Sequence, residues 1–238
     1  MSTLWNVLPY VVIALFLSGT AWRYRYDKFG WTTRSSELYE SRLLSVASPV
    51  FHYGILFVLA GHLVGLFIPD SWTSDLGVSE HAYHLLSLYT GTAAGLLTVA
   101  GIVLLIYRRR TTGAVFRATT ANDKAMYLVL LGAIVMGMWA KLTHATGDGY
   151  PYRETIAPWA RGVFTLQPDG SRMEGVPVTY QIHVLIGLAL IALVPFTRLV
   201  HMLSAPVQYL FRPYIVYRSR EPRQLAARAA RRGWEGAE

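Results

Sequence analysis

Five long apolar runs constrain the fold of this chain more than any other feature of its sequence. They cover roughly residues 4–22, 47–69, 83–107, 124–145 and 178–205. Each is long enough to cross a bilayer as a helix, which requires about 20 mostly apolar residues. Only 15% of the 238 residues are charged, whereas soluble domains carry about 25%. We therefore predict an all-α integral membrane protein, with five transmembrane helices in residues 1–205 and a separate tail in residues 206–238.

The positions of Lys and Arg predict how these helices are oriented. A basic cluster (Arg23, Arg25 and Lys28) follows the first run and none precedes it, so we expect a retained span and not a signal peptide. The segments after the first, third and fifth runs, with Arg198 near the end of the fifth, hold 18 of the 22 Lys and Arg residues. The others are Lys141, Arg153, Arg161 and Arg172. The positive-inside rule then places the N-terminus outside and the C-terminus in the cytoplasm.

The net charge of +8 could suggest nucleic acid or acidic lipid as a partner, but in a membrane protein the distribution of charge says more than its sum, and we predict no nucleic-acid partner. The basic tail, residues 206–238, could anchor the protein to anionic lipid headgroups or could dock a cytoplasmic partner, and the sequence leaves both open. The segment 146–177 is rich in turn residues and is expected to cover the outer surface.

Two of the apolar runs each contain two histidines, which are costly in hydrocarbon unless something pairs with them. "FHYGILFVLAGH" contains His52 and His62, and "QIHVLIGLALIALVPFTRLVH" contains His183 and His201. An ionisable side chain within a span indicates function by default, and four of them favour a bound cofactor over simple packing. The chain has no cysteine, which excludes thiolate-held metals and covalently attached c-type haem.

Depth in the membrane predicts which histidines pair. Because the two spans run in opposite directions, His52 and His201 lie near the cytoplasmic face, and His62 and His183 near the outer face. The separation along the helix is about 15 Å on the first span and about 27 Å on the second, so helix tilt must absorb the difference. Neutral imidazoles from facing helices suit the two axial positions of haem iron. Nearby glycines would leave room for a flat ring or for close helix packing: Gly54, Gly61, Gly65 and Gly187.

Haem iron with both axial positions filled moves electrons and does not bind a further ligand. We therefore predict a membrane electron carrier, with quinol as the lipid-phase donor and another subunit as the acceptor. A diiron oxidase would need carboxylates beside the histidines, and the spans have almost none. A transporter with histidine proton relays stays an alternative, whereas an anchor without cofactor leaves the four histidines unexplained. His81, His84 and His144, near span ends, are expected to supply interfacial polarity.

Several stretches resemble one known family over essentially the whole chain: "FHYGIL", "GHLVG", "FRATT", "QIHVLIG" and "PFTRLVH" are similar to the cytochrome b (gamma) subunit of membrane-bound respiratory nitrate reductase. The resemblance implies two non-covalent haems b, and menaquinol or ubiquinol oxidised near the outer one. It also implies that electrons pass to a cytoplasmic iron–sulfur (beta) subunit and then to a molybdenum (alpha) subunit that reduces nitrate. The implied location is the bacterial cytoplasmic membrane.

The resemblance further implies roles for individual residues. His62 and His183 would ligate the outer, distal haem, and His52 and His201 the inner, proximal haem. Members of the family bind quinol beside the outer haem through the glycine of the GHxxG stretch and a lysine before the third span, where this sequence has no lysine. The quinol-binding candidates are then Gly65, His81, Tyr83 and His84, and the candidates for binding haem propionates are Arg117 and Arg198.

Overall fold

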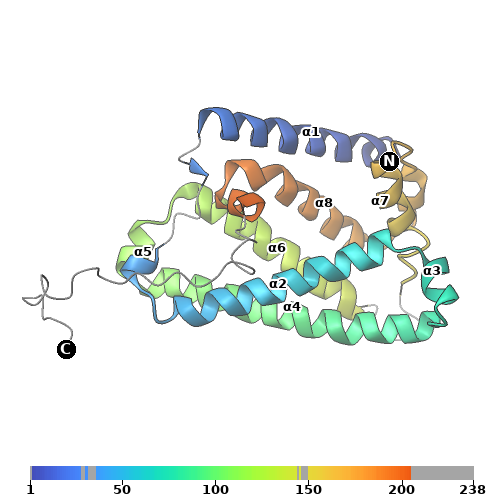
Figure 1. Ribbon diagram of the computed structural model, residues 1–238, viewed down its shortest axis with the longest axis horizontal. Helices are drawn as coiled ribbons and strands as arrows, with labels where there is room; N and C mark the ends of the chain where they lie inside the picture. The colour runs from blue at the N-terminus through green and yellow to red at the C-terminus, as the bar shows by residue number, and fades with distance from the viewer. Residues whose placement is uncertain (1, 28–29, 32–35, 144, 146–149, 205–238) are drawn as a thin grey trace, which may run out of the picture. The chain divides into compact units, whose positions relative to one another are not determined.

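The computed structural model describes residues 2–27, 30–31, 36–143, 145 and 150–204, and these fold as helices with short connections (Figure 1). Five segments are long and apolar enough to cross a membrane. They are α1 (Ser2–Tyr26), α2 (Leu44–Phe67), α4 (Glu80–Thr111), α6 (Ala121–Thr143) and Val178–Phe196, which begins with α8 (Val178–Leu193). The described residues contain no strand. The prediction of an all-helical protein with five helices long and apolar enough to cross a membrane is confirmed for these residues, while His144 and the tail, 206–238, lie outside the described residues.

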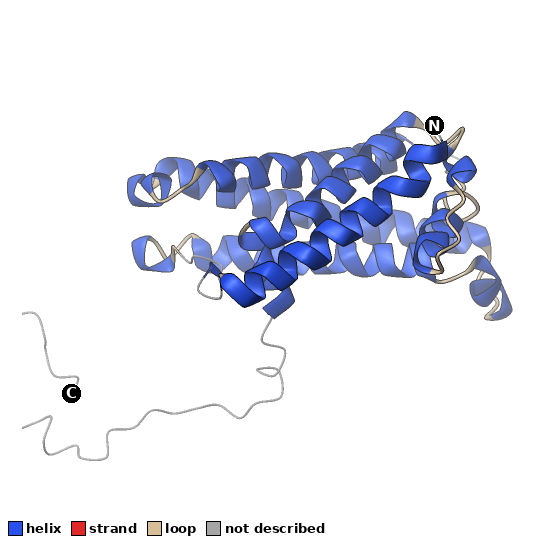
Figure 2. Ribbon diagram, turned by 90° about the horizontal axis from the view of Figure 1, so that it is seen from above, coloured by secondary structure: helices blue, strands red, loops and turns tan. Residues whose placement is uncertain are grey.

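The long helices pack side by side in the order α1, α8, α6, α4, α2, with shorter helices at the two ends of the bundle (Figure 2). The tightest approach is between α2 and α4. A Cβ on Gly54 would lie 2.6 Å from the backbone nitrogen of Thr98, and a Cβ on Gly101 would collide with the backbone of Phe51. Small residues allow helix backbones in membranes to come this close, so these two glycines fix the α2–α4 contact.

The segment between α6 and α8 forms a packed cap and not only turns. It contains α7 (Ile156–Phe164) and the 3-10 turn η3 (Gly170–Met173), which pack against the start of α1. Trp5 and Trp159 are buried edge to face with ring centroids 5.7 Å apart, and the Trp159 indole donates to the Trp5 carbonyl at 3.0 Å. Burying these aromatic rings while satisfying the indole N–H fixes the cap on α1.

The fifth span departs from the prediction of one helix through to residue 205. The α-helix α8 ends at Leu193 and is followed by two 3-10 segments, η4 (Val194–Phe196) and η5 (Arg198–Ser204). Pro195 cannot donate a backbone hydrogen bond, which ends the α-helical ladder. The guanidinium of Arg23 donates to the Pro195 carbonyl at 2.8 Å and holds the break against α1. Because α8 and η5 are separate segments, the expected 27 Å between His183 and His201 along one helix does not apply.

Candidate functional site

The structure brings the four span histidines together as two pairs. The ring centroids of His62 and His183 are 5.8 Å apart with 41° between the ring planes, and those of His52 and His201 are 6.1 Å apart with 69° between the planes. These are the neighbours that the depth argument expects, and their role as axial ligands stays a prediction. The two pairs are about 15 Å apart along α2, since ten residues separate its two histidines.

The spacing within each pair fits a metal ion between the rings. The backbones of α2 and α8 approach each other at few points if any, so the imidazoles reach toward each other across the bundle. Two imidazoles on opposite sides of one metal ion, with metal–nitrogen bonds of about 2 Å, place their ring centroids roughly 6 Å apart. Both pairs match this value, which favours one bound metal centre between the rings of each pair.

Hydrogen bonds to the backbone orient three of the four rings. The Nδ1 atoms lie close to carbonyl oxygens three or four residues earlier: His52 to Ser48 (2.7 Å), His62 to Val58 (2.8 Å) and His201 to Arg198 (2.5 Å). An imidazole that donates through Nδ1 keeps the lone pair on Nε2, the arrangement typical of a metal ligand. The Nδ1 of His183 is buried and makes no hydrogen bond of normal geometry, although the backbone of Ala133 on α6 interacts with this ring.

Glycines shape the space beside the pairs. Apart from the chain neighbours and the backbone of the same helix, no protein atom lies within 4 Å of the Cβ positions of Gly61 and Gly187, so the space beside both is open. Gly54 instead packs against α4, which is the alternative role that the sequence left open. A Cβ on Gly137 of α6 would lie 2.7 Å from Cε1 of His183. The absence of a side chain at position 137 therefore allows the His183 ring to occupy its observed place.

Polar residues gather beside the His62–His183 pair. Gly65 is buried on α2, three residues after His62, and its Cβ position lies 3.0 Å from the hydroxyl of Tyr152. Tyr152 also interacts with Tyr83, and the guanidinium of Arg153 lies 4.0 Å from the centroid of the Tyr83 ring. Burial of Tyr152 and the neighbouring Tyr83 hydroxyl raise the pKa of Tyr152. Its hydroxyl therefore stays protonated at neutral pH and can donate a hydrogen bond.

The other two quinol-binding candidates are placed differently. His81 is exposed, and His84 is half-buried with its Nδ1 buried and without a hydrogen-bond partner in the described structure. Sequence reasoning missed Tyr152 and also Lys141, whose ammonium lies 3.3 Å from the Ser87 hydroxyl on α4. The available signal was charge, since Lys141 is one of only four basic residues on the predicted outer side.

At the opposite end of the bundle, beside the His52–His201 pair, buried charges face each other. Nε of Arg198 lies 2.7 Å from the carboxylate of Asp123, and both side chains are nearly buried. The guanidinium of Arg108 is buried and pairs with Glu40 at 2.5 Å. Arg117, in the short helix α5 (Gly113–Arg117), is exposed. The two propionate candidates thus differ, because Arg198 already binds a carboxylate of this chain.

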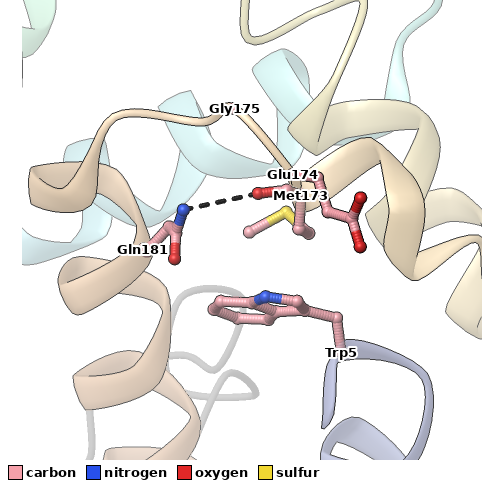
Figure 3. Close-up of a pocket in the computed structure, with 5 residues that line it drawn as sticks. All are labelled: Trp5, Met173, Glu174, Gly175 and Gln181. Atoms are coloured by element: carbon pink, nitrogen blue, oxygen red, sulfur yellow. Dashed lines mark hydrogen bonds between the residues drawn. The ribbon is translucent and has the colours of Figure 1, made fainter. Parts of the chain in front are cut away.

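A cavity of about 370 Å³ lies between the start of α1, η3 and the start of α8 (Figure 3). It is lined by Trp5, Met173, Glu174, Gly175 and Gln181, and none of the quinol-binding candidates is among these residues. The Gln181 amide donates to the carbonyl of Val176 at 2.8 Å and lies 3.4 Å from that of Met173. The Gln181 side chain therefore already connects η3 and the turn after it to α8.

The chain has five candidate spans and two histidine pairs, and within each pair the two imidazoles face each other across the bundle. These features define a class, the membrane proteins of the cytochrome b type. More specifically, the chain belongs to the nitrate reductase gamma subunit family, whose profile matches residues 1–220. The family resemblance found in the sequence is thereby confirmed.

Three relatives illustrate the range of similarity. The chain is 61% identical to the nitrate reductase-like protein NarX of Mycobacterium tuberculosis over 97% of its own length, and it spans only 35% of that protein. It is 41% identical to the nitrate reductase gamma chain of Bacillus subtilis, covering 91% of this chain and 97% of that one. It is 31% identical to the respiratory nitrate reductase 1 gamma chain of Escherichia coli, covering 90% and 96%.

Proposed function

We propose that this chain is the dihaem cytochrome b subunit that takes electrons from quinol in a nitrate reductase complex and anchors that complex to the membrane. The observation that carries the proposal is the presence of two imidazole pairs with centroids 5.8 and 6.1 Å apart. His62 and His183 would hold the distal haem, and His52 and His201 the proximal haem. When bound, two haems b supply reversible one-electron chemistry and therefore an electron path between the two ends of the bundle.

Quinol oxidation is assigned to the His62–His183 end. Oxidation of menaquinol or ubiquinol to the quinone releases two protons and two electrons. Gly65 and Tyr83 are the candidates that lie with Tyr152 in one polar group, and His81 and His84 are further candidates. A buried glycine beside hydroxyl groups suits an apolar ring that carries two oxygens, because the ring packs closely while its oxygens are hydrogen-bonded.

The basic residues support the orientation of the proposed subunit. The positive-inside rule places the N-terminus outside and the His52–His201 end at the cytoplasmic face of a bacterial cytoplasmic membrane. Electrons would pass there to an iron–sulfur (beta) subunit and then to the molybdenum (alpha) subunit that reduces nitrate. Arg117 and Arg198 would contact haem propionates, and the tail, 206–238, would bind anionic lipid or one of these partners.

This arrangement would charge the membrane without a proton pump. Protons leave at the outer face while electrons move inward, and each charge moved costs about 2.3 kcal/mol per 100 mV. The terminal acceptor must therefore be strongly oxidising, as nitrate is. The test is quinol-driven nitrate reduction in sealed vesicles of known orientation, with a pH indicator on each side. We expect proton release at the outer face, and release at the cytoplasmic face would overturn the proposed quinol site.

A histidine-based transporter without haem is not favoured, because the chain belongs to the nitrate reductase gamma subunit family. The two functions differ in a simple measurement. Purified protein with two haems b is red and gives sharp bands in a reduced-minus-oxidised spectrum, whereas a proton relay of histidines alone is colourless.

A further inference from the structure

Lys141 is a cation within a membrane-spanning helix, and none of the ion pairs found among the described residues includes it. It lies near the end of α6, is half-buried, and places its ammonium 3.3 Å from the Ser87 hydroxyl of α4. The guanidiniums of Arg108, Arg153 and Arg198, in contrast, each pair with a carboxylate. An ionisable side chain within a spanning helix indicates a functional site by default, and the half-buried ammonium of Lys141 is a candidate for binding a ligand that accepts a hydrogen bond.

The surrounding helices hold Lys141 close to the His62–His183 pair. A Cβ on Gly91 of α4 would lie 2.8 Å from both Cε and Nζ of Lys141, so the absence of a side chain there makes room for this lysine. One turn earlier on α6, Gly137 abuts the ring of His183. Four residues of α-helix rise about 6 Å, which places the backbone of Lys141 about one turn beyond the level of this histidine.

A continuous row of donors leads from Lys141 to Gly65. Ser87 contacts the ammonium of Lys141 and also interacts with the hydroxyl of Tyr152. The Tyr152 hydroxyl in turn lies 3.0 Å from the Cβ position of Gly65. The row therefore connects three spans and the segment before α7 at one end of the bundle, beside one of the two histidine pairs.

We propose that Lys141 and Tyr152 bind an oxygen of the quinol ring beside the His62–His183 pair, with Ser87 positioning both side chains. This proposal rests on the quinol oxidation proposed above and assigns the cation of the site to α6. When the first proton leaves the quinol oxygen, the ammonium of Lys141 stabilises the negative charge through a charge-assisted hydrogen bond. Complete oxidation then yields the quinone, with two protons released to water at the outer face and two electrons leaving along the proposed path toward the His52–His201 end, while Lys141 and Tyr152 keep their own protons.

The experiment replaces Lys141 in the full chain within its membrane complex. We expect Lys141→Met to raise the dissociation constant of menadione, measured by calorimetry on the oxidised protein, by at least tenfold, which corresponds to about 1.4 kcal/mol. The half-saturating concentration of menadiol in nitrate reduction should rise in parallel. Lys141→Arg should restore part of the binding, because it keeps the charge. The matched control is Lys124→Met, an exposed lysine at the other end of the same helix, which should bind menadione as the unmodified protein does.

Haem content and the dithionite-reduced spectrum report whether each variant is folded. If Lys141→Met loses haem, Tyr152→Phe becomes the deciding variant, with an expected several-fold weaker binding of menadione. Unchanged menadione binding in the folded variants would overturn the role of Lys141 and Tyr152 while leaving quinol oxidation intact. If the unmodified protein itself neither binds menadione nor oxidises menadiol, the proposed function fails, and the further inference fails with it.

Discussion

The two histidine pairs share the same residue type and nearly the same spacing, but their surroundings differ. Beside the His52–His201 pair, Arg198 faces Asp123 and Arg108 faces Glu40. Beside the His62–His183 pair, the ammonium of Lys141 contacts a serine hydroxyl, and the hydroxyl of Tyr152 lies against a glycine. The buried cations Arg108 and Arg198 at the first end are therefore paired with carboxylates, as in a scaffold. The other end also holds a paired cation, Arg153 with Glu80, but none of the ion pairs among the described residues includes Lys141, whose ammonium can donate to a bound oxygen.

The rings themselves are also held by different means. His52 and His201 both place Nδ1 on a backbone carbonyl, which orients the ring and raises the basicity of a ligand. His183 lacks a hydrogen bond of normal geometry at Nδ1 and is positioned by contact with Gly137. Hydrogen bonds thus orient both rings of the His52–His201 pair, whereas packing positions His183 in the other pair.

Removing one histidine from either pair should have the largest effect. His183→Ala and His201→Ala are each expected to remove one of two haems and to leave the other, because each pair draws one imidazole from α2 and one from the segment formed by α8, η4 and η5. Pyridine haemochrome analysis measures the haem per chain, and redox titration identifies which haem remains. His81→Ala, at an exposed histidine outside both pairs, is the control and should retain both haems. Loss of both haems from one substitution, in protein that still inserts, would contradict independent sites.

Breaking the buried ion pair should loosen the His52–His201 end selectively. Asp123→Ala leaves the guanidinium of Arg198 without its carboxylate, and breaking a buried pair costs roughly 3–5 kcal/mol. Since Arg198 begins η5, which carries His201, we expect the proximal haem to be released at a lower temperature than the distal one. Thermal release followed by difference spectra measures this order.

The control for this prediction is an exposed ion pair at the other end. Asp169 pairs with Arg172, and their side chains are 52% and 45% exposed. Exposed pairs contribute about 0–1 kcal/mol, so Asp169→Asn should release neither haem early. Equal effects of the Asp123 and Asp169 substitutions would show that burial of charge does not distinguish the two ends.

The sequence predicts the parts of this molecule that depend on position along a helix. Hydropathy locates the five spans, and depth along antiparallel spans brings His52 toward His201 and His62 toward His183. Pro195 is one local signal for the end of α8 at Leu193, but α1 and α2 continue through Pro9 and Pro49, so a proline alone does not predict a helix end. The 3-10 path that follows depends on distant contacts such as the one from Arg23. That path moves His201 off the helix that carries His183, which spacing along one helix could not reveal.

The polar group beside His62 was less predictable for a similar reason. Ser87 and Lys141 are 54 residues apart, and Tyr152 reaches Gly65 from a segment that sequence analysis interpreted as turns. Hydropathy and spacing describe each segment by itself, and they carry no information on which polar side chains meet between segments. A lysine inside an apolar run was the one local signal, and it indicates a site without naming its partners.

Adding a methyl group beside His183 should perturb only the distal site. Gly137→Ala places a Cβ 2.7 Å from the imidazole, so the ring must move, and such overpacking costs about 1–3 kcal/mol. We expect altered low-spin resonance of the distal haem and an unchanged proximal one. Gly132→Ala on the same helix is the control, because its Cβ would lie 3.8 Å from Ile186, an ordinary contact. If Gly137→Ala leaves the distal signal unchanged, hydrogen bonding and not packing positions His183.

The weakest effect concerns the pH dependence of stability, which should differ between the two ends. At the His52–His201 end, the Leu43 backbone N–H and the Arg108 guanidinium hold the pKa of Glu40 below its usual value of 4.5. A carboxylate with a lowered pKa in the folded state contributes stability that is fully present above about pH 4.5, its usual pKa, and is lost as the pH falls through the folded value. At the other end, burial and Tyr83 raise the pKa of Tyr152 above 10.0. The neutral hydroxyl is therefore favoured by folding, and stability is lost as the pH rises from about 10 toward the raised value.

Melting temperatures recorded across both pH ranges test this opposition. Glu40→Gln should flatten the acid limb and leave the alkaline limb unchanged, while Tyr152→Phe should do the reverse. The acid effect is the smaller of the two, because the Glu40 carboxylate is partly exposed and is screened by solvent. If Glu40→Gln instead alters the alkaline limb, the two ends are energetically coupled. The two ends of the bundle would then unfold as one cooperative unit. Their different surroundings would reflect location only, and their stabilities would not be independent.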